Sequence, residues 1–171
     1  VARASEELIS GSLFLREDRL IEAGNSQARA LAALSEAREQ FLDLKGLIEV
    51  AHADETRIAT ILEQGESDPE IDLAEFGPSL SALQARNLGR IERMGGMVGE
   101  MRLELDAAPP EEAEAGEAER KRLELAEGIL ALSESSMRGA AQSLGRIGEE
   151  ASAVGSARER VANALGGLDA L

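Results

Sequence analysis

The chain contains no cysteine, no tryptophan and no tyrosine, and it has three phenylalanines and one histidine among its 171 residues. The absence of cysteine excludes disulfide bonds, thiol nucleophiles and zinc–thiolate sites, although the compartment of the protein does not follow from it. With one histidine and no thiol, the side chains that most enzymes use as nucleophile or general base are almost missing. We therefore expect no enzymatic activity, no catalytic or metal site and no bound cofactor.

Long apolar runs and basic residues are also scarce. No run approaches the roughly 18 consecutive apolar residues of a transmembrane helix, so we expect no membrane insertion by this segment. The 18 Lys and Arg residues against 33 Asp and Glu residues give a formal net charge of -15. Such a surface repels nucleic-acid phosphates and anionic membranes, so we also expect no nucleic-acid binding. Because the chain begins with Val1, we expect a processed chain or a piece of a longer protein.

Apolar residues of moderate size dominate what is present. Hydrophobic residues make up 43% of the chain, whereas aromatic residues make up 2%. A core of Leu, Ile, Val, Ala and Met with few rings suits the narrow space between packed helices. The richness in Ala, Glu, Leu and Arg is typical of long helices and coiled coils.

The last third of the chain has apolar residues on two adjacent heptad rows. The first row contains Leu123, Leu130, Met137, Leu144, Ala151, Arg158 and Leu165, and the second contains Ala126, Ser133, Ala140, Ile147, Val154, Val161 and Leu168. This spacing predicts one continuous helix that packs along other helices. Arg158 interrupts the first row, and we expect its stem to pack while its charged head reaches a glutamate.

Three breaks divide the chain into helices. They are Gly24-Asn25-Ser26, which is either a sharp turn or only a kink, the loop over residues 65–78 and the pair Pro109-Pro110. Glycine ends helices and proline interrupts them, so we expect helices over about 3–23, 27–63, 79–107 and 112–167. The fold class predicted is all-α: an elongated antiparallel helical bundle of about four helices with coiled-coil-like heptad packing, in a single domain over residues 1–171.

Several polar residues lie at or near these apolar rows. Glu55 interrupts a row of the second helix, and Asn87 lies on a row of the third. A buried asparagine can fix the register between packed helices, and the alternative is a partly exposed polar residue. Glu49 and His52 form a Glu-x-x-His pair like those of di-iron carboxylate bundles. A second such pair is missing, so we expect both residues at the surface.

The C-terminal region resembles a part of the flagellins. Residues 154–168, VGSARERVANALGGL, resemble the C-terminal helix of that family, with Gly155 and Arg160 matching and Glu159 standing where flagellins carry asparagine. Residues 8–11, LISG, resemble the Ser-Gly step after the flagellin N-terminal helix. This resemblance implies one alternative function, a secreted filament-forming, flagellin-like subunit.

A second resemblance concerns bacterial chemoreceptors. The pair Glu149-Glu150 resembles the paired-glutamate modification sites of their helical bundles. Gly95, Gly96 and Gly99 lie inside the third helix, where glycines either permit close helix approach or mark a soft point. The second alternative is therefore a sensory or signalling helical bundle of a bacterial receptor.

The heptad rows favour a third function over both. The fourth helix outruns the third, so part of its seam needs another helix to cover it. We therefore predict a non-enzymatic structural or interaction bundle that assembles with itself or with another helical protein through a heptad seam. The residues predicted to form this interaction seam are Met137, Leu144, Ile147, Val154, Val161 and Leu165.

Overall fold

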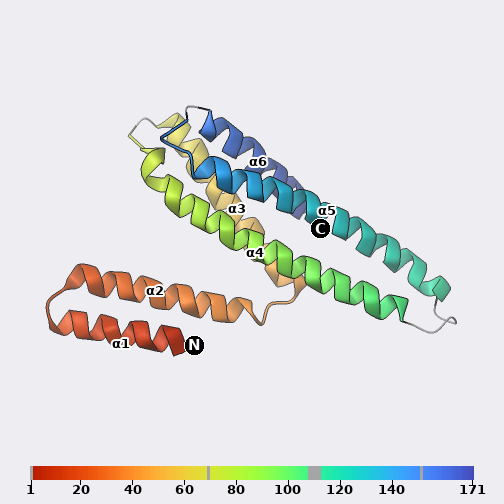
Figure 1. Ribbon diagram of the computed structural model, residues 1–171, viewed down its shortest axis with the longest axis horizontal. Coiled ribbons are helices and arrows are strands. Elements are labelled where there is room, and N and C mark those ends of the chain that lie inside the picture. The colour runs from red at the N-terminus through yellow and green to blue at the C-terminus, as the bar shows by residue number, and fades with distance from the viewer. Residues whose placement is uncertain (1, 69, 108–112, 151) are drawn as a thin grey trace. The chain divides into compact units, whose positions relative to one another are not determined.

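The computed structural model describes residues 2–68, 70–107, 113–150 and 152–171. Within these ranges it has six α-helices and no strand (Figure 1). The all-α prediction is confirmed, whereas the count of about four helices and the coiled-coil packing are not. The chain divides into two compact units, Val1–Asp43 and Leu44–Leu171, each of which is described by itself. That the whole chain forms a single domain stays a prediction.

The first unit is an antiparallel hairpin of α1 (Ala2–Arg16) and α2 (Leu20–Glu39) (Figure 1). The chain turns at Asp18, whose φ of 61° lies in the left-handed region that aspartate tolerates better than most residues. The backbone N–H of Arg19 donates to the Phe14 carbonyl at 2.9 Å, which closes the turn. The break predicted at residues 24–26 was wrong, because these residues lie inside α2.

Small residues line the contact between α1 and α2. The buried residues that form this hairpin seam are Ala4 and Gly11 on α1 and Ala23, Ser26, Ala30 and Ala33 on α2. A Cβ added to Gly11 would lie 3.4 Å from the Cβ of Ser26. The two helices therefore approach closely, and the larger apolar side chains of the hairpin lie outside its seam.

The second unit contains four helices that pack in a ring. They are α3 (Leu44–Ser67), α4 (Leu73–Asp106), α5 (Ala113–Leu144) and α6 (Ala153–Asp169). α4 packs against α3 and α5, and α6 packs against α5 and α3 (Figure 1). All four helices contribute to one buried apolar cluster, whose members include Ile58, Leu62, Leu80, Leu144 and Val161.

Three helix boundaries differ from the prediction in the middle of the chain. The helix expected over 27–63 is interrupted at residues 40–43 and its second part continues to Ser67. The loop is shorter than predicted, because the Asp72 carboxylate accepts a hydrogen bond from the Ala74 N–H at 2.9 Å and caps α4 there. Pro78, expected in the loop, lies inside α4.

The continuous helix predicted over 112–167 was also wrong. α5 ends at Leu144, and the chain turns back before α6 begins at Ala153. Gly148 has a φ of 95° in this turn, a conformation that suits glycine, and a Cβ added there would lie 2.9 Å from the Cβ of Ala74. The heptad rows continue across the turn because both helices bury one face, and spacing alone does not distinguish one long helix from two that fold back on each other.

Two alanine substitutions test this turn. Gly148→Ala is expected to lower the free energy of unfolding by about 1–2 kcal/mol, because a left-handed conformation is strained for alanine. Gly155→Ala is expected to raise it by up to about 1 kcal/mol, because Gly155 is exposed within α6 and nothing lies within 4 Å of an added Cβ. Urea denaturation followed by circular dichroism measures both. One continuous helix would instead be stabilised by both substitutions.

Candidate functional site

The six residues of the predicted interaction seam lie on α5, in the turn after it and on α6. Met137, Leu144, Ile147 and Val161 are buried, and Val154 and Leu165 are half-buried against the same apolar cluster. These side chains therefore pack within the bundle of their own chain. Their role as an interaction seam between chains stays a prediction.

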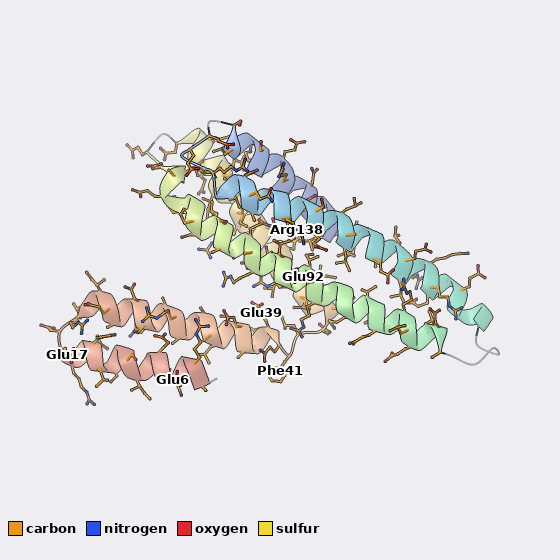
Figure 2. All side chains as sticks on the ribbon, in the orientation of Figure 1. Glu6, Glu17, Glu39, Phe41, Glu92 and Arg138 are labelled. Atoms are coloured by element: carbon orange, nitrogen blue, oxygen red, sulfur yellow. The ribbon has the colours of Figure 1, made fainter. Side chains whose placement is uncertain are left out.

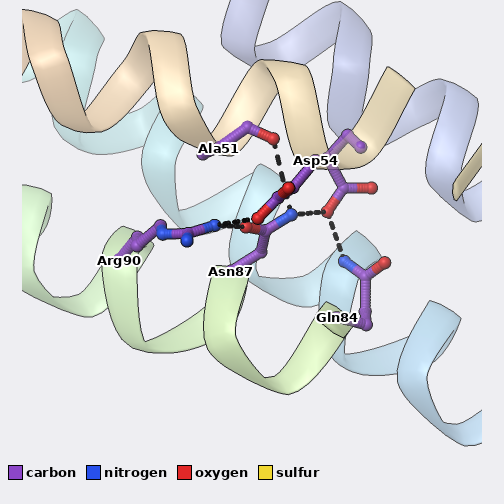
Figure 3. A network of polar contacts seen from close by, with 6 residues as sticks. Ala51, Asp54, Gln84, Asn87 and Arg90 are labelled. Atoms are coloured by element: carbon purple, nitrogen blue, oxygen red, sulfur yellow. Dashed lines mark hydrogen bonds and ion pairs between the residues drawn. The ribbon is translucent and has the colours of Figure 1, made fainter. Parts of the chain in front are cut away.

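A polar cluster joins α3 to α4 inside the second unit (Figure 3). The side chains of Glu55, Gln84 and Asn87 are all fully buried. Glu55 Oε1 accepts hydrogen bonds from Gln84 Nε2 at 2.5 Å and from Asn87 Nδ2 at 2.9 Å. Asn87 Nδ2 also lies 3.4 Å from the Ala51 carbonyl oxygen. Asn87 is thus buried, as the register interpretation requires, and it contacts both a side chain and the backbone of α3.

An ion pair between Arg90 and Asp54 adjoins this cluster. Arg90 Nη1 lies 2.6 Å from Asp54 Oδ2, and the same nitrogen donates to Asn87 Oδ1. The Arg90 side chain is 6% exposed, so the charge-assisted bond is largely shielded from water. The network arises because three- and four-residue spacings place each set on one face of its helix: Ala51, Asp54 and Glu55 on α3, and Gln84, Asn87 and Arg90 on α4.

Glu55 is the unusual member of the cluster electrostatically. Burial raises the pKa of its carboxyl group, the hydrogen bonds from Asn87 and Gln84 oppose this shift, and the neighbouring charge of Asp54 adds to it. Glu55 Oε2 and Gln84 Oε1 are both buried acceptors without a hydrogen-bond partner. Protonation of Glu55 would remove its buried charge and turn one of its acceptor oxygens into a hydrogen-bond donor.

The two residues of the Glu-x-x-His pair do not act together. His52 Nε2 lies 3.0 Å from Asp169 Oδ1 of α6, whereas Glu49 Oε1 lies 3.7 Å from Lys45 Nζ at the surface. In the ranges that the structure describes, no group of three or more His, Asp or Glu side chains is placed to hold a metal ion. Glu49 and His52 therefore have separate partners, on α3 and α6.

Two expectations from the sequence concern Arg158 and the glycines of α4. The contact expected for Arg158 is present, and the close helix approach considered for the glycines is not. Arg158 pairs with Glu66 of α3, so its charged head does reach a glutamate. Nothing lies within 4 Å of a Cβ added at Gly95, Gly96 or Gly99, so these glycines do not serve close helix approach. The interpretation of these three residues as a soft point stays a prediction.

Large apolar side chains are exposed along the hairpin and beside it. Phe41, between α2 and α3, is 89% exposed (Figure 2). Eight residues of the hairpin are 44–79% exposed: Leu8, Ile9, Leu13, Leu15, Leu20, Ile21, Leu31 and Leu34. On α5, Leu125, Ile129 and Leu132 border an open depression of about 480 Å³. Exposed apolar surface on this scale marks candidate contact sites for other proteins.

Comparisons with protein-family models, curated proteins and solved structures found no match for this chain. Among the helices described, none combines the length and the apolar character needed to cross a membrane.

The polar cluster predicts a specific pH dependence of stability. Because the pKa of Glu55 is raised on folding, the native chain binds this proton more tightly than the unfolded chain does. The stability contributed by Glu55 is fully present below the unfolded pKa, about 4.3, and is lost as the pH rises through the folded pKa. We therefore expect the urea midpoint of the natural chain, measured relative to that of Glu55→Gln, to fall as the pH is raised from acid to alkaline values. Glu63→Gln, an exposed substitution on α3, is the control. A pH-independent difference between the natural chain and Glu55→Gln would contradict the assignment.

Proposed function

We propose that this chain is a non-enzymatic helical assembly module, which packs against itself or against another helical protein. The observation that carries this proposal is the reversed distribution of side chains in the α1–α2 hairpin. Its hairpin seam contains alanine, glycine and serine, whereas its leucines and isoleucines lie outside. A surface of this kind is expected on a helix pair that is covered by further helices.

The energetics of the hairpin support the same conclusion. Burial contributes about 0.8 kcal/mol for each CH₂-sized group, and the hairpin seam buries little more than methyl groups. Ordering the backbone costs about 1–2 kcal/mol per residue. Units of about 40 residues usually need disulfides, a metal or oligomerisation to be stable, and this chain has no cysteine. Covering the outward leucines would supply the missing apolar burial.

The second unit offers a smaller surface of the same kind. α4 and α5 contain 34 and 32 residues, whereas α3 and α6 contain 24 and 17. The α4–α5 pair therefore extends beyond α6 (Figure 1). The exposed Leu125 precedes the part of α5 that α6 contacts, because Gly167 of α6 packs beside Ile129 and Ser133. Within the second unit, neither α3 nor α6 covers this end of α4 and α5.

Light scattering over a concentration series tests the proposal. We expect the molar mass to rise above the 18.1 kDa of one chain as the concentration increases. Because each copy carries a net charge of -15, added salt should screen the repulsion and strengthen self-association. A chain that stays monomeric at every concentration and salt level would contradict self-assembly. Association that salt weakens would indicate charge-driven contacts in place of apolar ones.

A further inference from the structure

We propose that five leucines on one face of the α1–α2 hairpin bind the same face of a second copy of this chain. The five are Leu8 and Leu15 on α1 and Leu20, Leu31 and Leu34 on α2, and together we call them the leucine face. This inference rests on the proposed function, because it names the surface and the partner through which the module assembles.

Ion pairs identify the opposite face of the hairpin. Arg29 Nε of α2 lies 2.9 Å from Glu7 Oε2 of α1, and Arg3 Nη1 lies 3.9 Å from Glu36 Oε2. Each pair connects the two helices on the same side of the hairpin seam. Glu7 and Arg3 therefore mark the polar flank of α1, and Arg29 and Glu36 mark the polar flank of α2.

The leucines occupy the other flank of each helix. On α1, Leu8 follows Glu7 by one residue, which is a rotation of about 100° across the direction of Ala4 and Gly11. On α2, Leu20, Leu31 and Leu34 are similarly rotated away from Arg29 and Glu36, on the far side of the hairpin seam. Since the polar flanks of the two helices meet on one face, the leucine flanks form the opposite face.

The leucine face is free of acidic residues, although the chain as a whole is strongly acidic. In residues 2–39, all of which are described, the positions between the leucines on this flank are Ser5, Ser12, Gly24 and Gln27. The charged residues on the same flank are basic: Arg38, one turn after Leu34, and Arg16, which borders one depression with Leu8 and Ser12. Two such faces can meet without placing carboxylates opposite each other, which makes the surface complementary to itself.

The size of the surface fits a dimer. Burying a leucine or isoleucine contributes about 1.5–3 kcal/mol at about 25 cal/mol per Å², which corresponds to about 60–120 Å² per side chain. On this scale the exposed parts of the five leucines, and of Ile9 and Leu13, which border the same depression as Leu8, amount to roughly 230–470 Å². A standard interface takes about 800 Å² from each partner, of which about 60% is apolar. The upper end of the range for the hairpin reaches this apolar area, and a second hairpin placed face to face would complete a four-helix bundle.

Spin-label distances test this arrangement in the whole chain. The protein has no cysteine, so one introduced cysteine is the only labelled site. Gln27→Cys places the label near the centre of the leucine face, and Asn25→Cys places it on the polar flank of the same helix; both positions are exposed. Because packed helices lie about 8–10 Å apart, we expect a label-to-label distance below about 25 Å at position 27 and one at least about 10 Å longer at position 25.

The outcomes separate this inference from the proposed function. A dimer with the shorter distance at position 25 would overturn the leucine-face contact and leave self-assembly intact. A strictly monomeric labelled chain, matched by a monomeric natural chain in light scattering, would overturn both.

Two matched substitutions provide an independent test. Leu31 on α2 and Leu103 on α4 are each 66% exposed, so Leu31→Glu and Leu103→Glu add the same charge at equally exposed leucines. We expect Leu31→Glu to raise the dimer dissociation constant tenfold or more, because a carboxylate would be buried between copies. Leu103→Glu should change it less than threefold. Equal losses of affinity would contradict the inference, and far-ultraviolet circular dichroism would establish that both variants keep their helices.

Discussion

The second unit depends on the return of α6 across the space between α5 and α3. Ala157 and Val161 of α6 are fully buried in the shared apolar cluster, and Arg158 pairs with Glu66 of α3. Without this return, α3 would lose its packing against α6, and the ring of four helices would be open on one side. The left-handed conformation of Gly148 is part of the turn that makes the return possible.

The polar cluster places groups inside the bundle that are costly to bury. Burying Glu55, Gln84 and Asn87 costs desolvation, and two of their acceptor oxygens have no partner. In the observed register of α3 and α4, Asn87 reaches Glu55 and the Ala51 carbonyl. A slide of one helical turn would leave these polar groups buried against apolar side chains. Because burial raises the pKa of Glu55, protonation of its carboxyl group makes this contact between α3 and α4 sensitive to pH.

The two units enclose different kinds of side chain between their helices. The bundle of α3 to α6 encloses leucine, isoleucine, valine and methionine, whereas the hairpin of α1 and α2 encloses alanine, glycine and serine. A seam of small residues lets two helices approach closely but buries little apolar area. The leucines of the hairpin therefore stay exposed. This contrast between the two units supports the proposal that the hairpin is the contact region.

The sequence by itself determined the helical class and the candidates for its polar interior. Apolar residues at three- and four-residue spacing and only four prolines favour helices, and Glu55 and Asn87 were visible as polar residues on apolar rows. Tertiary structure decided that these residues meet, because the hydrogen-bonded pairs are 29 and 32 residues apart in sequence. It also decided that the chain folds back between α5 and α6, which buries Leu144 and Val161 in their own bundle. A heptad row indicates that one face of a helix is covered, but it does not indicate which helix covers that face.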